Sequence, residues 1–229
     1  MANHHGDLIW YELLTSDPAA AQAFYAPLLG WSFANAGHDV GMDYFIFSTA
    51  ESAVGGLAKM PGGAPVPPVW LGYIGVDDVD KMVESVTHGG GRVLMPAMDI
   101  PTVGRIALLA DPQGAPFYVM RGASDEESLS FSFDRPRPGH CAWNELAPPP
   151  PADALHFYGQ RFGWAKDGEL DMGPLGNYEF LRHVGRSEGA EMAGVFGAVM
   201  PKMPEMPVCA WTYYFRVPDI DAAAIYITA

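Results

Sequence analysis

The chain carries one stretch of sequence twice, and this internal repeat constrains the fold more than any other feature. Residues of segment 10–31 recur in segment 143–164 at a constant offset of 133. They are Trp10, Glu12, Leu13, Pro18, Ala19, Ala21, Phe24, Tyr25, Gly30 and Trp31, which return as Trp143, Glu145, Leu146, Pro151, Ala152, Ala154, Phe157, Tyr158, Gly163 and Trp164. A second block, Trp70, Tyr73, Val76, Asp78 and Asp80, returns 141 residues later as Trp211, Tyr214, Val217, Asp219 and Asp221. Such regular self-similarity predicts two tandem domains that are built alike.

Each repeat opens with a predicted strand and then a helix. Residues 8–15 form the strand, and Ser16-Asp17-Pro18 is a helix start signal, because a capping residue precedes a proline in the first turn. The predicted elements of the first unit are a strand over 8–15, a helix over 18–28 and strands from Gly30-Trp31, over 43–49 and over 52–59. The same order then restarts with a strand over 69–76, a helix over 79–87 and strands over 92–95, 104–110 and 115–120. The sequence therefore predicts paired βαβββ units.

The repeat also predicts the domain boundaries. We expect a first domain over 1–121, an interdomain linker over 122–138 and a second domain over 139–229, because the segment 122–138 is polar and flanked by prolines. By the offset of 141, Ala229 corresponds to His88, so three C-terminal strands of the second domain have no counterpart here. An incomplete sheet would leave an unpaired edge. We expect either a longer chain or another chain to complete it.

Composition narrows the classes of function. The chain has 13 Lys and Arg against 27 Asp and Glu, for a net charge of −14, which repels phosphate backbones and anionic lipids. No apolar run approaches the length of a membrane span and no secretory signal is visible, while Cys141 and Cys209 show no metal-ligand spacing. We therefore expect a cytoplasmic protein that binds a small molecule, with no nucleic-acid or membrane partner and a homodimer as one option.

The paired units resemble a known superfamily. The segments IWYELLTSDPAAAQAFYAPLLGW, WLGYIGVDDVD and NELAPPPPADALHFYGQRFGW are similar to the vicinal oxygen chelate superfamily, the fold of glyoxalases, bleomycin resistance proteins and extradiol dioxygenases, and to its two-domain bacterial glyoxalase-like branch. The resemblance implies an α+β fold in which tandem βαβββ modules form curled mixed β-sheets around a concave cup. In catalytic members, His or Glu on the first and last strands hold a divalent metal.

The positions of those metal ligands can be tested on this chain. Counting along the strands as in the superfamily, they fall on Trp10 in the first domain, on Trp143 in the second and at about Tyr118 on a last strand. Indole has no lone pair suited to a divalent metal, and a phenol is a reluctant ligand. We therefore predict an aromatic-lined cup with no metal and no other cofactor, although an unusual ligand set stays open.

Two carboxylates stand beside these tryptophans. Glu12 and Glu145 lie two positions after Trp10 and Trp143, so each shares a strand face with its tryptophan. A half-buried Glu among aromatic rings would have a raised pKa and could act as a general base. The alternative is a structural carboxylate that accepts hydrogen bonds at the mouth of the sheet. A second-domain site built from Glu145, His140 and His183 is a further hypothesis.

These observations leave three classes of function. The first is a metal-free binding protein whose ligand-binding residues are Trp10, Glu12, Tyr118, Trp143, Glu145 and His140. The second is a metal-dependent lyase, isomerase or dioxygenase with a non-standard ligand set and Glu12 or Glu145 as weak catalytic candidates. The third is a structural protein whose cups are filled by its own side chains.

Overall fold

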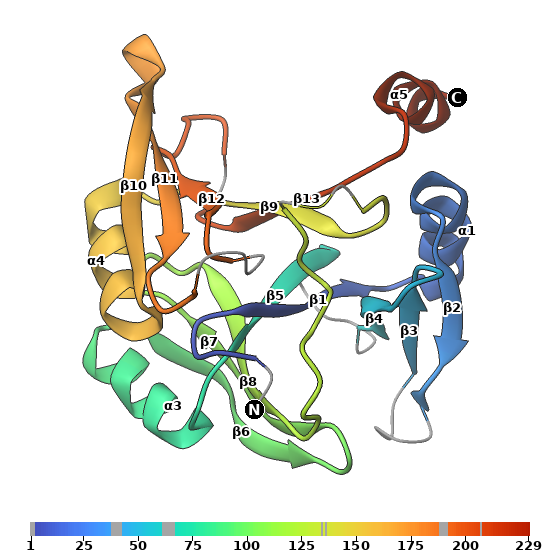
Figure 1. Ribbon diagram of the computed structural model, residues 1–229, viewed down its shortest axis with the longest axis horizontal. Coiled ribbons are helices and arrows are strands. Elements are labelled where there is room, and N and C mark those ends of the chain that lie inside the picture. The colour runs from blue at the N-terminus through green and yellow to red at the C-terminus, as the bar shows by residue number, and fades with distance from the viewer. Residues whose placement is uncertain are drawn as a thin grey trace.

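Two curled mixed sheets, one for each repeat, organise the computed structural model, which describes residues 3–37, 43–60, 67–133, 135, 137–187, 192–206 and 208–229. The first sheet has eight strands in the order β2-β3-β4-β1-β5-β8-β7-β6, and the second has five in the order β10-β11-β12-β9-β13. Figure 1 shows the two sheets and the helices that flank them. The predicted α+β architecture is confirmed.

The first sheet is two βαβββ units side by side. The first unit comprises β1 (Leu8–Thr15), α1 (Pro18–Leu29), β2 (Ser32–Asn35), β3 (Tyr44–Ser48) and β4 (Ala53–Lys59). The second comprises β5 (Val69–Gly75), α3 (Val79–His88), β6 (Arg92–Ile100), β7 (Gly104–Ala110) and β8 (Pro116–Gly122). The strand expected over 92–95 is thus longer than predicted, because β6 continues through two register shifts to pair with β7 along its whole length. Each unit pairs its first and last strands in parallel, β1 with β4 and β5 with β8.

The helices start and stop where the sequence predicts. The Asp17 carboxylate accepts a hydrogen bond from the Ala20 amide at 3.0 Å, and Asp78 accepts one from Lys81 in the same way. Helix α1 ends at Gly30, whose φ of 69° suits a residue without a side chain. Gly163 ends α4 with a φ of 67°, so the repeat preserves both helix boundaries.

The second sheet follows the first unit closely. Its elements are β9 (Cys141–Leu146), α4 (Pro151–Phe162), β10 (Trp164–Asp171), the short 3₁₀ helix η1 (Gly173–Leu175), β11 (Asn177–His183), β12 (Val195–Val199), β13 (Trp211–Phe215) and α5 (Ile220–Thr228). Within the described residues β13 pairs with β9 alone. The division at residues 122–138 remains a prediction.

Reciprocal tryptophan contacts join the two repeats. The Trp31 indole N–H donates to the Gly139 carbonyl at 2.8 Å, and the Trp164 indole donates to the Gly6 carbonyl at the same distance. Trp164 is the repeat counterpart of Trp31, and Gly139 is that of Gly6. The repeats are therefore related by an approximate twofold axis, and each covers the start of the other's first strand.

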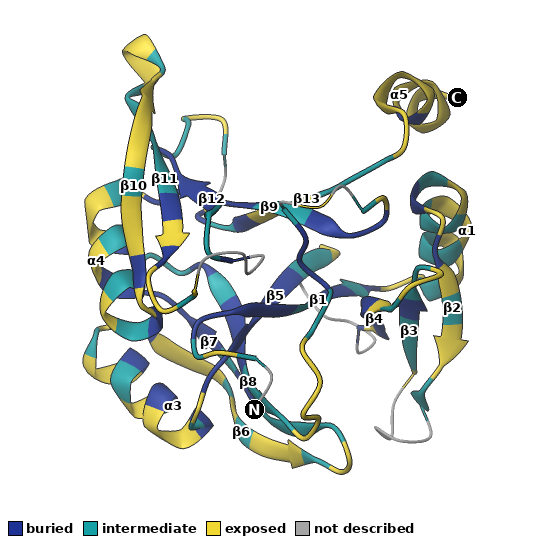
Figure 2. Ribbon diagram, viewed as in Figure 1, coloured by how far each residue is buried: buried dark blue, intermediate teal, exposed yellow. Residues whose placement is uncertain are grey.

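The core lies between the repeats, and the helices pair across it. Helix α4 packs against α3, and the Tyr226 hydroxyl of α5 donates to the Phe24 carbonyl of α1 at 3.2 Å. Burial in Figure 2 follows this arrangement, with the central strands buried and α5 exposed. The expected linker is packed as well, since Ser128 donates to the Ile9 carbonyl at 2.6 Å and Phe131 is buried.

Helix α5 leaves most of its apolar side chains exposed. Its repeat counterpart α3 buries Val79, Met82 and Val86, whereas α5 leaves Ile225 70% exposed and Ile220 and Ile227 exposed as well. Among the described residues, no helix is long and apolar enough to cross a membrane.

Candidate functional site

The candidate site lies on the face of the first sheet that looks away from the other domain. Strand alternation places Trp10 and Glu12 on this face, as predicted. Tyr73 on β5 stands directly opposite Trp10, and Tyr118 on β8 stands directly opposite Tyr73 with its ring stacked at 4.2 Å. Three neighbouring central strands thus bring their aromatic side chains to one place.

Glu12 is the centre of a hydrogen-bond network. The Tyr73 hydroxyl donates to Glu12 Oε2 at 2.9 Å, and the nearby hydroxyls of Tyr44 and Tyr118 act to lower the pKa of this carboxyl group. The Trp10 indole N–H donates to the Tyr44 hydroxyl oxygen at 3.1 Å. With 4% of its surface exposed, Glu12 accepts its hydrogen bonds from phenols. The network ties β1 to β3, β5 and β8.

A glycine allows Tyr44 to reach this network from β3. Strand β4 lies between β3 and β1, and its residue opposite Glu12 is Gly56. A Cβ atom on Gly56 would stand 1.9 Å from the Tyr44 hydroxyl and 2.4 Å from its ring carbon Cζ. The missing side chain therefore makes room for the Tyr44 ring to cross β4.

Burial shifts the acidities of the whole cluster. It raises the pKa of Glu12, and the hydrogen bonds from Tyr73, Tyr44 and Tyr118 oppose this effect only in part. Burial and the nearby Glu12 charge raise the pKa of Tyr44, Tyr73 and Tyr118 well above the usual range of phenols. The three phenols are therefore held in their protonated, hydrogen-bond-donating form.

The second domain repeats the network. The Trp143 indole donates to the Tyr178 hydroxyl at 2.7 Å, and Tyr178 donates to Glu145 Oε2 at 2.6 Å. Tyr214 donates to the other carboxylate oxygen at 3.1 Å. Tyr178 and Tyr214 occupy the positions of Tyr44 and Tyr73, so both domains contain a Trp-Tyr-Glu-Tyr set.

The second set is less enclosed than the first. Tyr214 is 46% exposed because β13 has no described neighbour on its outer edge, whereas Tyr73 is covered by β8. Partial burial and the Glu145 carboxylate raise the pKa of Tyr214 to about 12. Sequence reasoning named Tyr118, Trp143 and Glu145 but missed Tyr44, Tyr73, Tyr178 and Tyr214. Only Tyr73 and Tyr214 left a signal, because they recur in the second repeat block.

The predicted histidine site is not assembled. The His140 ring contacts the Ser52 hydroxyl at 3.1 Å and the Pro138 carbonyl at 3.4 Å, and burial lowers its pKa. His183 contacts the His5 carbonyl at 2.7 Å. Neither histidine has a hydrogen bond to Glu145 among the described contacts. His140 belongs to the junction between the domains because its ring reaches a first-domain loop rather than the cup.

The donors in the cup do not fit a divalent metal. Each set offers a single carboxylate, and its other oxygen atoms are phenols that burial and the neighbouring carboxylate keep protonated. Over the described part of the chain, no three His, Cys, Asp or Glu side chains gather where they could hold a metal ion. The residues that the superfamily pattern would assign to a metal are committed to hydrogen bonds instead.

The mouth of the first cup is apolar and rich in methionine. Met95 and Met98 on β6 stand opposite Leu108 and Ile106 on β7, and Ile106 packs with Tyr118 in one cluster. Met98 is 45% exposed, which is unusual for a large apolar side chain on a sheet. Flexible, polarisable methionine side chains suit an irregular apolar ligand. The described cavities of ≈ 470 and ≈ 410 Å³ lie elsewhere, and Glu12, Tyr73 and Tyr118 are all buried, so in this conformation neighbouring side chains close over these residues.

Comparison with known proteins agrees with the fold. The family model described as Glyoxalase/Bleomycin resistance protein/Dioxygenase superfamily matches residues 7–119. CFP32 of Mycobacterium tuberculosis, which is named as a candidate glyoxylase, is 36% identical over 94% of this chain and 78% of its own length. The anthracycline biosynthesis protein DnrV of Streptomyces peucetius is 30% identical over 93% of this chain and 78% of its own length.

Solved structures resemble this chain along nearly its whole length. The Mn(II)-bound glyoxalase from Novosphingobium aromaticivorans matches 98% of this chain and 70% of its own, with a TM-score of 0.63 and 20% identity. The 2,2',3-trihydroxybiphenyl 1,2-dioxygenase of Sphingomonas wittichii matches 98% of this chain and 78% of its own, with a TM-score of 0.62 and 10% identity. At these identities the likeness concerns the fold.

Proposed function

This chain belongs to the glyoxalase/bleomycin resistance protein/dioxygenase superfamily, and we propose that it binds a small, flat and largely apolar molecule in its first cup without a metal ion. The observation that carries the proposal is the Glu12 network. At positions where the superfamily pattern calls for metal ligands, this chain has Trp10 and Tyr118, and beside them the buried Glu12 carboxyl group accepts a hydrogen bond from the Tyr73 hydroxyl. Polar recognition then comes from hydrogen bonds rather than from coordination.

The surroundings of the network define the class of ligand. The mouth contributes Met95, Met98 and Leu108, so most of the ligand must be apolar. The Tyr118 hydroxyl can donate to a carbonyl or phenol oxygen of the ligand, whereas the Tyr73 hydroxyl already donates to Glu12, whose carboxylate would repel an anion. A neutral polycyclic phenol or quinone meets these conditions. The names of two relatives, the anthracycline biosynthesis proteins DnrV and DauV, support this class.

Ligand entry requires the side chains in the cup to move. Methionine has three rotatable bonds, so the Met95, Met98 and Met120 side chains can swing aside at low cost. The backbone need not change, because the network anchors the central strands. Such local rearrangement of side chains is common when a small molecule binds.

A second candidate function is enzymatic, and the raised pKa of Glu12 favours it. A carboxylate with a raised pKa is a stronger base than an ordinary one and can accept a proton from a carbon or oxygen acid. The activity would be that of a lyase, isomerase or dioxygenase with a non-standard metal ligand set. In that case Glu12 and Glu145 would be the carboxylates available to a metal.

Fluorescence titration tests the binding proposal. Danthron, a neutral dihydroxyanthraquinone, is the probe, and anthraquinone sulfonate is its charged comparison. We expect danthron to quench tryptophan fluorescence, Trp10→Leu to reduce that quenching, and Tyr118→Phe to weaken binding roughly tenfold, which corresponds to about 1.4 kcal/mol. Tyr226→Phe on α5, outside both cups, is the matched control. Equal binding of both compounds, or no effect of Tyr118→Phe, would contradict the proposal.

Metal analysis separates the two candidate functions. We expect danthron affinity to survive dialysis against a chelator. A stoichiometric divalent ion that disappears from the double variant Glu12→Gln, Glu145→Gln would instead favour the enzymatic candidate. A location in the cytoplasm is part of the proposal and is supported by the two free, buried cysteines. The homodimer stays a prediction.

A further inference from the structure

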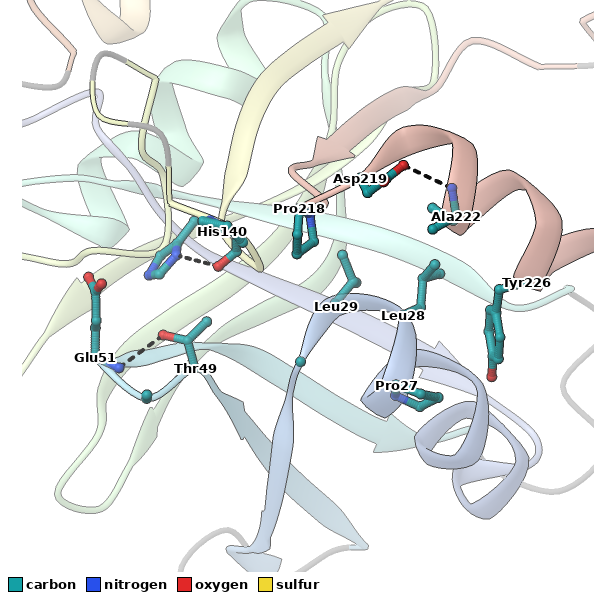
Figure 3. A pocket seen from close by; sticks show the side chains of 14 residues that line it. Pro27, Leu28, Leu29, Thr49, Glu51, His140, Pro218, Asp219, Ala222 and Tyr226 are labelled. Carbon is teal, nitrogen blue, oxygen red and sulfur yellow. Dashed lines mark hydrogen bonds between the residues drawn. The ribbon is translucent and has the colours of Figure 1, made fainter.

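A cavity lies at the junction of the two domains, away from both cups. It holds ≈ 470 Å³ between the C-terminal end of α1 and the start of α5. Figure 3 shows Leu28 and Leu29 facing Pro218 and Ala222 across it, with Glu51 and His140 at one end and Tyr226 at the other. Because the wall comes from both repeats, the cavity exists only when the domains are docked.

The internal repeat supplies a second, filled copy of this junction. Helices α4 and α3 meet as α1 and α5 do, and the counterpart of Leu28 there is Arg161. The Arg161 guanidinium donates to the Ser85 carbonyl of α3 at 2.9 Å and to the Phe157 carbonyl of α4 at 3.0 Å. It packs so closely on α3 that a Cβ atom on Gly89 would stand 1.7 Å from it. The Arg161 side chain therefore occupies the space between α4 and α3.

Smaller side chains account for the open junction. Leu28 stands in place of Arg161, Ala222 in place of Lys81, and Ala223 in place of Met82. All three replacements line the cavity. The open junction has thus lost the Arg161 guanidinium and the long apolar side chain of Met82, although Tyr226 stands where the filled junction has Ser85. Lys81 is largely exposed and pairs with Asp78, so its replacement matters less.

The electrostatics of the cavity match the lost guanidinium. Its lining includes two carboxylates and no Lys or Arg. Glu51 is largely exposed and makes a long ion pair of 3.8 Å with Arg137, which lies outside the lining, and Asp219 caps α5. Helix α1 ends at the cavity with no basic residue in its last turn, whereas Arg161 lies in the last turn of α4. The C-terminal end of a helix carries partial negative charge, which favours a cation. His140 lines the cavity without offering a hydrogen bond to a ligand, because its two ring nitrogens already contact Ser52 and Pro138.

We infer that the cavity between α1 and α5 is a second ligand site, and that it takes an amphipathic organic cation whose charged head and apolar body replace the side chains of Arg161 and Met82. The body of the ligand lies against Leu28, Leu29 and Ala223. Its head lies near Glu51 and the last carbonyls of α1. The site is separate from the cups, so it does not depend on the function proposed above.

Calorimetric titration of the full chain with n-hexylguanidinium tests the inference, with n-hexylurea as a neutral compound of the same shape. We expect the guanidinium compound to bind at least tenfold more tightly than the urea, and Glu51→Gln to narrow that ratio. Ala223→Met restores the side chain of the filled junction and should abolish binding. Ala224→Met, at an exposed position of the same helix, is the matched control and should bind normally.

A second variant keeps the test decisive if Ala223→Met folds poorly. Leu28→Arg places a guanidinium where the filled junction has one, so it should raise the melting temperature and abolish binding of n-hexylguanidinium. Equal affinities for the two compounds would overturn the inference. Unchanged binding in Leu28→Arg would overturn it as well, because binding would then lie elsewhere on the acidic surface.

Discussion

The Tyr11 hydroxyl donates a hydrogen bond to Asn144 Oδ1 at 2.8 Å, although these two residues occupy the same position in the two repeats. A second contact follows the same rule, since the Gly72 amide donates to the hydroxyl of its counterpart Tyr213 at 2.7 Å. The approximate twofold axis therefore runs between β1 and β9 and between β5 and β13. The difference between the two copies at this position gives Tyr11 a buried hydrogen-bond partner.

Replacement of Tyr11 by phenylalanine should destabilise the joint between the repeats. The variant leaves Asn144 Oδ1 buried with only a weak contact to the Cys141 thiol at 3.7 Å. A buried polar atom that loses its partner costs about 1–3 kcal/mol. Urea unfolding measures the loss. Tyr226→Phe, which removes an exposed hydroxyl, should cost much less, and equal losses would contradict this account of the interface.

The stability of the protein should depend on pH through Glu12. Burial raises the pKa of Glu12 above its ordinary value of 4.5, so the folded protein retains a proton that the unfolded chain has lost. Unfolding releases this proton, and stability must fall as the pH rises from about 4.5 through the raised pKa. Below that window the group is protonated in both states and has no effect.

The Glu12→Gln variant isolates this dependence, because an amide does not titrate. We expect the free energy of unfolding of the wild type, minus that of Glu12→Gln, to decrease as the pH rises through the window. Urea titrations at several pH values measure the difference. Glu84→Gln, on the exposed side of α3, supplies the control and should show no comparable trend. A flat difference for Glu12→Gln would contradict the assignment of a raised pKa.

Gly56→Ala should disrupt the first network from a strand that contributes no side chain to it. The added methyl group would collide with the Tyr44 ring, and overpacking of this kind costs about 1–3 kcal/mol. Displacement of Tyr44 also removes the acceptor of the Trp10 indole, so tryptophan fluorescence should shift. Gly122→Ala is the matched control, because its nearest neighbour would lie 3.8 Å away. Equal stability of the two variants would show that Tyr44 can leave the cup freely.

Features that depend on local sequence could be predicted, whereas residues placed by contacts with distant parts of the chain could not. Trp10 and Glu12 were placed on one face because alternation along a strand is a local property, and the repeat fixed the order of the elements. Tyr44 could not be assigned, because it reaches Glu12 across β4 through the gap at Gly56. The predicted site role of His140 was not supported either. Its position just before β9 does not reveal that its ring contacts Ser52 of the other repeat. The homodimer and the missing strands remain predictions.

The two networks provide a final prediction in which each is the control for the other. Tyr73→Phe and Tyr214→Phe delete the same hydrogen bond to Glu12 and to Glu145. Tyr73 is 5% exposed, so its loss leaves a buried carboxyl group that water cannot reach and should cost about 1–3 kcal/mol. Tyr214 is largely open to solvent, and water can replace its hydroxyl, so its loss should cost below about 1 kcal/mol. Urea unfolding compares them, and a larger cost at Tyr214 would mean that the second cup is more enclosed in solution than the first.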